Sequence, residues 1–353
     1  MTTTAEVRAA QVDDPGFGRY FTDHMAMARW DRSRGWHDVE VVPRQDLVMH
    51  PSAMVLHYGQ AVFEGLKACV QGDGGVALFR PSASAARFSR SAARLAMPEL
   101  PIALFLATCE DLVRADREWV PARPEHSLYL RPVMIASEPS LGVRPANEFL
   151  YFVIASPTAG FFPGGVRPIS VWVADDYVRA APHGLGSAKC PSNYAASLLG
   201  KKEAVARGCD EVVWLDAVER RWVEEMSGMN VFVVLGEAGG HRVLVTPAAG
   251  DTILDGITRS SLIELARHLG YAVREEPIGI DEWCEGARSG AVVEAFACGT
   301  AAVVAPIGHL RSARGEWTVG NGQPGPVTLE LRDALVSIQE GRAPDLFGWL
   351  HRV

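Results

Sequence analysis

Long apolar runs and clusters of basic residues are missing from this 353-residue chain. No window approaches the ~20 apolar residues that a membrane-spanning helix needs. The first residues, MTTTAEVRAAQVDDPGFG, lack the basic start and apolar core of a secretory signal. The formal net charge of −8 argues against a surface for nucleic acid or anionic membranes. We therefore expect neither nucleic acid nor a membrane among its partners.

Cysteine and histidine patterns are equally uninformative for metals or disulfides. The six cysteines are scattered without a C-x-x-C pair, and the ten histidines form no H-E-x-x-H motif. The sequence thus predicts no metal and a reducing, cytoplasmic compartment. It also lacks G-x-G-x-x-G, the phosphate-binding P-loop and the G-x-S-x-G nucleophile elbow. Those absences argue against a Rossmann dehydrogenase, a P-loop NTPase and a serine hydrolase.

The composition is that of a folded protein, with 48% hydrophobic and 22% charged residues. A chain of 353 residues is long for a single core, so two domains are expected. The richest internal Pro/Gly stretch, PTAGFFPGGVRP, begins at Pro157 and ends at Pro168. We predict an N-terminal domain at 1–157, a linker at 158–168 and a C-terminal domain at 169–353.

Hydrophobic periodicity predicts both helices and strands in each half. A turn that leads into a helix is expected at 56–68, and residues 72–75 are typical of a hairpin turn. Helices are predicted at 82–95, 104–118, 193–207, 256–270, 281–289 and 327–339, and strands at 40–43, 76–79, 127–136, 149–156, 169–174, 211–215, 230–235, 243–246, 291–297 and 301–306.

Lys189 follows the small-residue segment GLGSA at 184–188 and precedes a predicted helix. Burial among small residues disfavours a charged ammonium, which suits a lysine that acts as a neutral nucleophile. A lone lysine in such a place is more often an ordinary surface residue. The rest of the sequence has to decide between these interpretations.

Two arginine patterns suggest anion binding. Arg87, Arg90 and Arg94 share one side of a predicted helix, either as a solvated face or with one arginine turned inward to an anion. Tyr129 and Arg131 share one face of a predicted strand. An arginine between apolar neighbours needs an anionic partner, so Arg131 indicates either a structural salt bridge or a substrate contact.

Two glycine-containing segments are possible anion cradles. Gly256-Ile257-Thr258 starts a predicted helix, whose free N–H groups and positive dipole end attract anions. Cys298-Gly299-Thr300 forms a tight turn between predicted strands. The chain also has Tyr194 five residues after the lysine and the carboxylate pair Glu224-Glu225.

Together these features match pyridoxal phosphate chemistry. A lysine forms the imine, a helix N-terminus and an arginine hold the phosphate, and a carboxylate keeps the pyridine nitrogen protonated.

Ordered blocks along nearly the whole chain resemble the branched-chain amino-acid aminotransferases, which are class IV (fold type IV) pyridoxal-phosphate enzymes. The blocks are FGRYFTDHM from Phe17, LHYGQAVFEGLK from Leu56, YLRP from Tyr129, EPSLGV from Glu138, NYAAS from Asn193, EMSGMNVF from Glu225, GITR from Gly256 and FACGTA from Phe296. The resemblance implies an α+β fold of two domains, with a small N-terminal α/β domain and a larger, barrel-like C-terminal α/β domain.

The resemblance also implies roles for individual residues. Lys189 would be the catalytic residue, which binds pyridoxal 5'-phosphate and shuttles a proton between Cα and C4′. The other cofactor-binding positions implied are Arg87, Arg179, Tyr194, Glu225, Ile257, Thr258 and Thr300. The substrate-binding positions implied are Phe17, Tyr58, Phe63, Tyr129, Arg131, Leu141, Val143, Thr300 and Ala301. Leu141 and Val143 resemble a loop that closes over the partner subunit's pocket, which implies a homodimer.

The activity implied is amino transfer from leucine, isoleucine or valine to 2-oxoglutarate, with small amino-acid and 2-oxo-acid substrates. Alternatives are a specialised aminotransferase for an aromatic or stereoisomeric β-branched substrate, a D-amino-acid transaminase and an aminodeoxychorismate lyase. A binding or regulatory protein that has lost catalysis on the same fold is a further alternative. The retained Lys189, Glu225 and Thr258 argue against that last one.

The sequence departs from the family pattern at three places. Pro191-Ser192 stand where two glycines are usual, and Pro191 removes a backbone donor beside the lysine. Asp255 replaces the usual proline before the phosphate-binding segment. Ala302 and Ala305 occupy the positions of a redox C-x-x-C found in some members, so we expect no thiol switch.

Overall fold

The computed structural model describes residues 3–162 and 165–353, so Pro163 and Gly164 of the predicted linker lie outside the described residues. The chain divides into two compact units. Unit 1 contains residues 1–160, 188–191 and 337–353, and unit 2 contains residues 161–187 and 192–336. The predicted domain limits of 1–157 and 169–353 stay a prediction; residues 188–191 cluster with the first unit rather than with their sequence neighbours.

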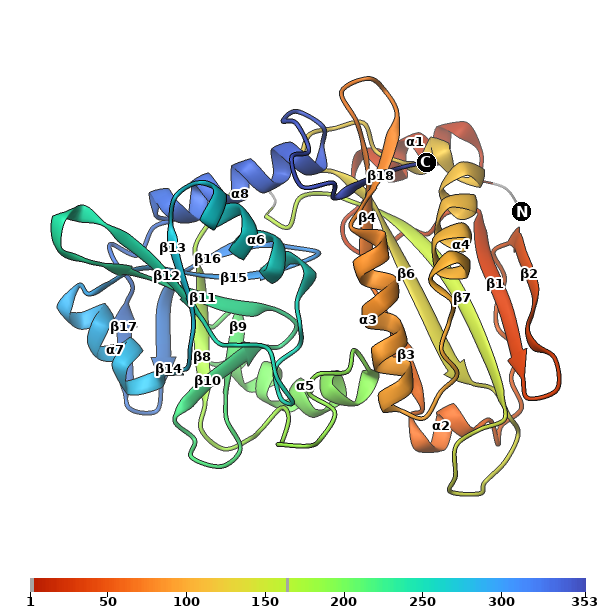
Figure 1. Ribbon diagram of the computed structural model, residues 1–353, viewed down its shortest axis with the longest axis horizontal. Coiled ribbons are helices and arrows are strands. Elements are labelled where there is room, and N and C mark those ends of the chain that lie inside the picture. Colours follow the sequence, from red (N-terminus) through yellow and green to blue (C-terminus); the bar gives the residue numbers. More distant parts are fainter. Residues whose placement is uncertain (1–2, 163–164) are drawn as a thin grey trace. The chain divides into compact units, whose positions relative to one another are not determined.

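Unit 1 is built on an antiparallel sheet of eight described strands, in the order β18-β5-β4-β6-β7-β1-β2 with β3 paired to β6 (Figure 1). The strands are β1 (His24–Asp31), β2 (Gly35–Pro43), β3 (Ala61–Phe63), β4 (Leu66–Val70), β5 (Val76–Phe79), β6 (Ser127–Ala136), β7 (Glu148–Thr158) and β18 (Leu350–Arg352). The long strands β6 and β7 pair in continuous register from Ser127↔Thr158 to Ala136↔Phe149.

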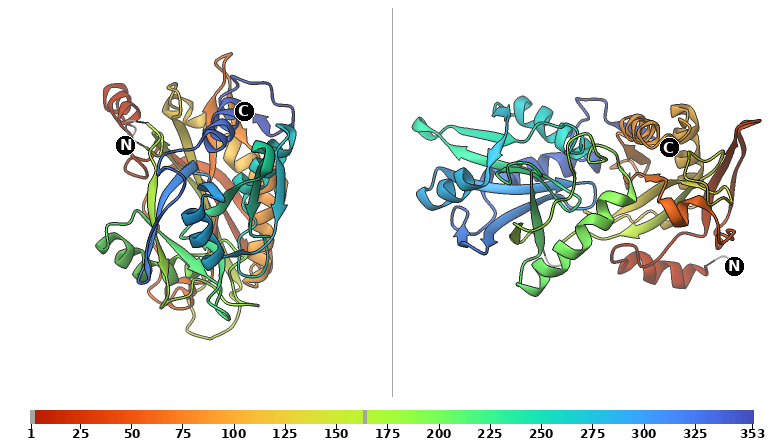
Figure 2. Two further views of the ribbon diagram at one scale, coloured as in Figure 1. Left: turned by 90° about the vertical axis from the view of Figure 1, so that its left-hand side faces the viewer. Right: turned by 90° about the horizontal axis from the view of Figure 1, so that it is seen from below.

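Helices α3 (Pro81–Arg94) and α4 (Ile102–Ala115) cover one face of this sheet, and the right-hand view of Figure 2 shows them end-on and side by side. Their buried residues recur every three or four positions, which is the spacing of one helix face. Phe88 of α3 meets Phe105 of α4 and Tyr151 of β7, with ring centroids 5.6 and 5.8 Å apart. Helix α1 (Ala5–Asp13) lies on the opposite face, and α2 (Met54–Tyr58) and the 3-10 turn η1 (Arg117–Trp119) complete the unit.

Unit 2 is built on a mixed, curled sheet of ten described strands, in the order β13-β12-β11-β15-β16-β8-β9-β10-β14 with β17 paired to β16 (Figure 1). Its core includes alternate residues of several strands, such as Val171 and Val173 in β8 and Val231 and Val233 in β11. The strands are β8 (Ile169–Ala174), β9 (Glu211–Leu215), β10 (Trp222–Met226), β11 (Asn230–Gly236), β12 (Arg242–Thr246), β13 (Ala272–Glu275), β14 (Ile278–Gly279), β15 (Val292–Gly299), β16 (Val303–Ser312) and β17 (Gly315–Thr318).

The helices of unit 2 are mostly short and amphipathic. They are α5 (Pro191–Ala206), α6 (Ile257–His268), α7 (Ile280–Ser289), α8 (Pro326–Gln339) and the 3-10 turn η2 (Ala238–Gly240), with the last residues of α8 counted in unit 1. Helix α6 begins directly after Gly256 and buries Leu262, Leu265 and Ala266. Within residues 3–162 and 165–353, every helix is too short or too polar to cross a lipid bilayer.

Most predicted elements lie within a few residues of their observed limits, but the helix predicted at 56–68 is wrong. Only Met54–Tyr58 is helical, and Gly59 ends this turn with a left-handed φ of 62°. The following residues form β3 and β4, which both pair with β6. Pairing with a buried central strand overrode the local preference of this segment for a helix. The helix α1 and the strands β1, β10, β13, β14, β17 and β18 were not predicted.

Candidate functional site

Lys189 belongs to unit 1 because its backbone is hydrogen-bonded there. Its N–H donates to Ser91 Oγ on α3 (2.9 Å), and its carbonyl accepts from the N–H of Phe63 (3.0 Å). Its half-buried side chain places Nζ 5.2 Å from the centre of the Phe63 ring. A cation is attracted to such a ring face, and a neutral amine loses less on leaving water there. The lysine is therefore held between a helix and a strand end rather than on a solvated surface.

Arg87 lies one helical turn before Ser91 on α3 and is paired with Glu64. Its Nε and Nη2 donate to the two carboxylate oxygens of Glu64 at 2.7 and 2.9 Å. The arginine and glutamate side chains are only 5% and 0% exposed. Of the three arginines, only Arg87 is turned inward, where it meets Glu64, while Arg90 and Arg94 are exposed. Its role as a phosphate ligand stays a prediction.

Several predicted substrate residues gather around the lysine within unit 1. The Phe17 and Tyr129 rings meet edge to face, with centroids 5.2 Å apart. Arg131 donates to the Tyr129 hydroxyl (3.1 Å), and its guanidinium lies 4.8 Å from the centre of the Phe63 ring, which Lys189 also faces. Phe17, Tyr129 and Arg131 are therefore connected by successive contacts. The Phe63 ring links Arg131 to Lys189.

Arg131 makes no ion pair with a carboxylate among the described residues, and its Nε is buried without a hydrogen-bond partner there. A buried guanidinium N–H without an acceptor is unfavourable, so the site favours an anionic ligand over a structural salt bridge.

The close approach of Tyr129 explains the glycine in the F-E-G segment. A Cβ atom at Gly65 would lie 1.9 Å from the Tyr129 hydroxyl oxygen, so no other residue fits without moving the tyrosine.

Elsewhere in unit 1, the Tyr58 hydroxyl donates to the Leu141 carbonyl at 2.5 Å. Leu141 and Val143 are 64% and 88% exposed.

In unit 2, Glu225 at the end of β10 forms a buried ion pair with Arg179 and accepts from the N–H of Leu254 (3.4 Å). The two paired side chains are 4% and 5% exposed. Arg179 also donates to the Thr252 carbonyl. An adjacent positive charge favours the ionised carboxylate. The neighbouring Glu224 differs, because burial raises the pKa of its carboxyl group.

The start of α6 is held by Asn230. The Asn230 amide donates to the Leu254 carbonyl (3.0 Å), and a Cβ atom at Gly256 would lie 1.9 Å from Asn230 Oδ1. Gly256 has no side chain, so no side-chain oxygen caps the first turn of α6, which contains Ile257 and the buried Thr258. A helix start without a side-chain cap is a suitable place for a phosphate.

The turn between β15 and β16 lies next to Asn230, at the start of β11. Asn230 is the register partner of Cys298, directly before Gly299-Thr300-Ala301. A Cβ atom at Gly299 would lie 3.3 Å from the Gly228 carbonyl, and one at Gly228 would lie 3.5 Å from the Tyr194 ring. Unit 2 therefore brings Tyr194, the two glycine segments and the Glu225 carboxylate around one end of its sheet.

The two units by themselves carry the donor set that pyridoxal 5'-phosphate needs. Unit 1 offers the amine of Lys189, and unit 2 offers a buried carboxylate at Glu225, the phenol of Tyr194 and the uncapped start of α6. These residues fit pyridoxal 5'-phosphate. The fit rests on the first turn of α6, which follows Gly256 and has no side-chain cap. No cluster of three or more potential metal ligands occurs in the described part of the chain.

Sequence reasoning missed three residues that position this site: Glu64, Ser91 and Asn230. Glu64 stands in the apolar run AVFEGLKA, where a lone carboxylate signals a buried cationic partner. Ser91 lies four positions after Arg87, which places it on the same helix face. No sequence signal marks Asn230, because its amide acts on a loop 24 residues later.

Known proteins resemble this chain over almost its whole length. The family model of class IV aminotransferases (Amino-transferase class IV) matches residues 61–310. A probable branched-chain-amino-acid aminotransferase of Streptomyces coelicolor is 52% identical, over 98% of this chain and 94% of the relative. A branched-chain-amino-acid aminotransferase of Mycolicibacterium smegmatis is also 52% identical, over 99% and 95%.

Among solved structures, the T.th. branched-chain amino acid aminotransferase complexed with N-(5'-phosphopyridoxyl)-L-glutamate superposes with a TM-score of 0.73 and 31% identity, covering 92% of this chain and 98% of that one. The predicted α+β fold of the fold type IV enzymes is thereby confirmed. The match of the family model and the 52% identity of full-length relatives show that this chain belongs to the class IV aminotransferases.

Proposed function

We propose that this protein transfers the amino group of leucine, isoleucine or valine to 2-oxoglutarate, with pyridoxal 5'-phosphate as cofactor. The observation that carries the proposal is the cluster of Lys189, Phe63, Arg131 and Tyr129 in unit 1, where an amine, an apolar wall and an unsatisfied guanidinium meet. The 52% identical relatives carry the name of this activity.

Pyridoxal 5'-phosphate, when bound, supplies an aldehyde that accepts the amino group and a ring that withdraws electrons from Cα. The solved relative holds a phosphopyridoxyl-glutamate adduct, which supports the same cofactor here. Glu225 would face the ring nitrogen, and its ion pair with Arg179 keeps it negatively charged, so that a proton on that nitrogen is favoured. Tyr194 would donate to the ring hydroxyl. The first turn of α6, Thr300 and Arg87 would bind the phosphate.

Lys189 has two tasks in this proposal. Its Nζ would hold the cofactor covalently, and the same amine would accept a proton from the substrate Cα and donate one back during the transfer. The backbone hydrogen bonds to Ser91 and Phe63 fix the main chain from which Nζ must reach both positions. A correctly positioned base of this kind is worth about 10²–10⁴ in rate.

Arg131 and the aromatic residues explain how one pocket serves two kinds of substrate. Phe17, Phe63 and Tyr129 offer apolar surface to a branched side chain. The guanidinium of Arg131 lies at the edge of this surface and can bind the side-chain carboxylate of glutamate. The backbone at Thr300-Ala301 and the hydroxyl of Tyr58 would receive the α-carboxylate.

We further propose a homodimer in which Leu141 and Val143 cover the substrate pocket of the partner. Their exposure of 64% and 88% supports this arrangement, because apolar side chains gain by burial at an interface. The domain limits at 157 and 169 belong to the same proposal, since the Pro/Gly-rich segment between them is typical of a linker.

The test is a donor screen on purified Lys189→Ala, wild-type and Lys202→Ala proteins. Lys202 is exposed on α5 and serves as the matched lysine control. Wild type and Lys202→Ala should transaminate L-leucine, L-isoleucine and L-valine with 2-oxoglutarate, whereas Lys189→Ala should lose at least about 100-fold in kcat. Borohydride reduction should attach the cofactor to the peptide that contains Lys189.

Activity only with D-amino acids, with aminodeoxychorismate or with an aromatic donor would replace the proposed substrate class. A reduced cofactor on another lysine would overturn the role of Lys189. Loss of cofactor binding and of all donor reactions in wild type would favour a binding protein on this fold.

A further inference from the structure

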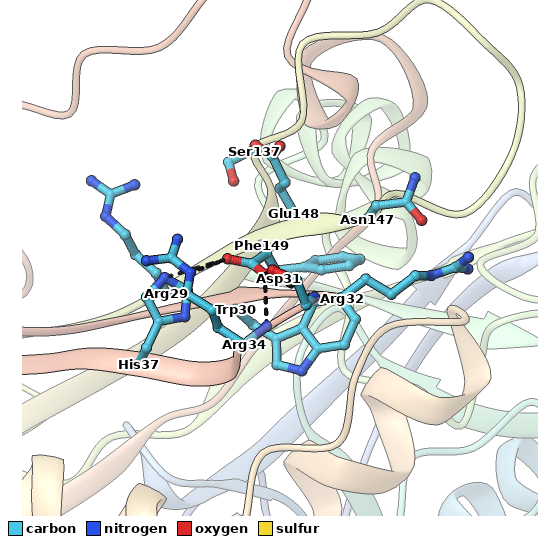
Figure 3. Close-up of a pocket in the computed structure, with 11 residues that line it drawn as sticks. Arg29, Trp30, Asp31, Arg32, Arg34, His37, Ser137, Asn147, Glu148 and Phe149 are labelled. Carbon is cyan, nitrogen blue, oxygen red and sulfur yellow. Dashed lines mark hydrogen bonds and ion pairs between the residues drawn. The ribbon is translucent and has the colours of Figure 1, made fainter.

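A cavity of about 480 Å³ lies within unit 1, away from the residues assigned above. It is bordered by the hairpin of β1 and β2, by Ser137 after β6 and by the start of β7 (Figure 3). Its lining residues are Arg29, Trp30, Asp31, Arg32, Ser33, Arg34, His37, Ser137, Asn147, Glu148 and Phe149.

The cavity is positively charged on a chain whose net charge is −8. Three arginines border it, against the two carboxylates Asp31 and Glu148. Asp31 is bound by Arg34 Nε (2.7 Å) and by the hydroxyl of Ser33 (2.6 Å). These bonds lower the pKa of Asp31, and the hydrogen bond from the Ser33 hydroxyl has the largest effect. Asp31 is therefore negatively charged at neutral pH and neutralises one arginine.

The other two arginines share the cavity with one further carboxylate, that of Glu148. Within the described residues, the side chains of Arg29 and Arg32 form no hydrogen bond and no ion pair, and Figure 3 shows Arg32 turned away from Asp31. The turn that carries Arg32 is held in place, because Asp31 Oδ1 also accepts from the N–H groups of Ser33 and Arg34 at 2.9 Å each. Two guanidinium groups on a hairpin fixed in this way lose less conformational entropy on binding an anionic group than lysine side chains would.

Aromatic rings form part of the same wall. Trp30 is half-buried and meets the buried Phe149 edge to face, with ring centroids 5.8 Å apart. The half-buried indole of Trp30 borders the cavity beside guanidinium groups, which favours a flat ligand that stacks on the ring while its anionic group binds arginine. The cavity volume exceeds what inorganic phosphate alone would fill.

The cavity also contacts the loop that carries Leu141 and Val143. The N–H of Asn147 donates to Glu138 Oε2 at 2.6 Å, and its side-chain amide does so at 3.3 Å. Glu138 is in turn paired with Arg144 at the far side of this loop. A ligand that accepts a hydrogen bond from Asn147 would compete with Glu138 for that donor. It would thereby loosen the contact that Glu138 makes across the loop.

We infer that this cavity binds a small aromatic anion, a flat ring with a phosphate or carboxylate group, and that its occupancy alters the loop from Glu138 to Asn147. The binding half of this inference is independent of the reaction. The effect on the loop rests on the proposed function, in which that loop covers the partner's substrate pocket.

Titration calorimetry of the cofactor-loaded dimer tests the binding. The probes are adenosine 5'-monophosphate and indole-3-carboxylate, with adenosine as the ring without charge and inorganic phosphate as the charge without a ring. Both aromatic anions should bind at least about tenfold more tightly than either control, and added salt should weaken them. Equal binding of inorganic phosphate and the aromatic anions, or no binding by any probe, would overturn the site.

Matched variants separate this site from general charge effects. The double variant Arg29→Ser/Arg32→Ser should weaken both aromatic anions at least about tenfold. The double variant Arg274→Ser/Arg288→Ser, which removes two exposed arginines of unit 2, should leave their affinity unchanged. Equal weakening in both variants would show that net charge alone attracts the probes.

The effect on the loop is tested with the same ligand. Saturating adenosine 5'-monophosphate should change the KM for the 2-oxo acid at least about twofold in wild type and not in the double variant. Binding without any change in KM would overturn the coupling to the loop, while the binding site itself would stand. A dimer without transaminase activity would overturn the proposed reaction but not the binding result.

Discussion

A buried arginine–glutamate pair occurs among the described residues of each unit, and the two pairs are built differently. In unit 1, Arg87 and Glu64 form a two-pronged contact, and Glu64 also accepts from the N–H of Gly65 at 3.0 Å. In unit 2, Arg179 contacts Glu225 through Nη2, and its buried Nε has no hydrogen-bond partner among the described residues. The first pair is geometrically complete, whereas the second leaves a donor unsatisfied.

The difference bears on how much each pair contributes to stability. A buried ion pair offsets its desolvation only where the geometry is good and the remaining donors are satisfied. Arg87 and Glu64 make a two-pronged contact, which fits a pair that holds α3 against the sheet in addition to the phosphate role proposed for Arg87. The pair in unit 2 leaves a buried donor unsatisfied, so we expect it to contribute less to stability.

The largest expected effect is on stability in unit 1. Glu64→Gln removes the charge that compensates the buried Arg87, so the free energy of unfolding should fall by about 3–5 kcal/mol. Urea unfolding followed by fluorescence measures the change. The double variant Glu64→Gln/Arg87→Met removes both charges and should recover part of the loss. A single variant as stable as wild type would show that this pair does not stabilise unit 1.

Glu225→Gln should have a smaller effect on stability and a larger one on chemistry. Arg179 keeps its hydrogen bond to the Thr252 carbonyl, so the expected loss is about 1–3 kcal/mol. The neutral amide no longer favours a protonated ring nitrogen, so the visible absorbance of the bound cofactor should change and kcat should fall. An unchanged spectrum and kcat would remove Glu225 from the proposed site.

Glu224 allows a pH test beside this pair. Burial raises the pKa of its carboxyl group in the folded protein, so its ionisation disfavours folding as the pH rises from the ordinary value through the raised one. Glu224→Gln cannot ionise, and its stability relative to wild type should therefore increase as the pH rises from 4.5 towards neutral. Thermal unfolding across that range measures the difference. A constant difference would show that Glu224 ionises as freely in the folded protein as in the unfolded chain.

The smallest effect is expected in the loop near Leu141. The pKa of Glu138 is lowered to about 2, chiefly by the hydrogen bond from Arg144. Its stabilising contribution is present above its ordinary value of 4.5 and is lost as the pH falls towards 2. Arg144→Ala should raise the pKa of Glu138 towards 4.5, measurable by NMR titration. The stability change should stay below about 1 kcal/mol, because the Arg144 side chain is 44% exposed and water screens the pair.

The sequence by itself determined most elements and most candidate residues. Strands such as β6 and β8 were predicted to the residue, because apolar, β-branched runs between turn residues are strong local signals. Lys189, Arg87 and Glu225 were identified from residue type and family blocks. The segment at 56–68 failed because its pairing with β6 depends on residues far along the chain.

Only the tertiary structure decided which of these residues belong together. It placed Lys189 with Phe63 and Ser91 through backbone hydrogen bonds. It also paired Arg87 with Glu64 rather than leaving it on a solvated helix face. Neither result can be deduced from spacing, since a long-range contact is chosen by packing and by the need to satisfy buried charges. The cavity beside Arg29 and Arg32 likewise exists only in the folded chain, because Asn147 and Phe149 reach it from a distant strand.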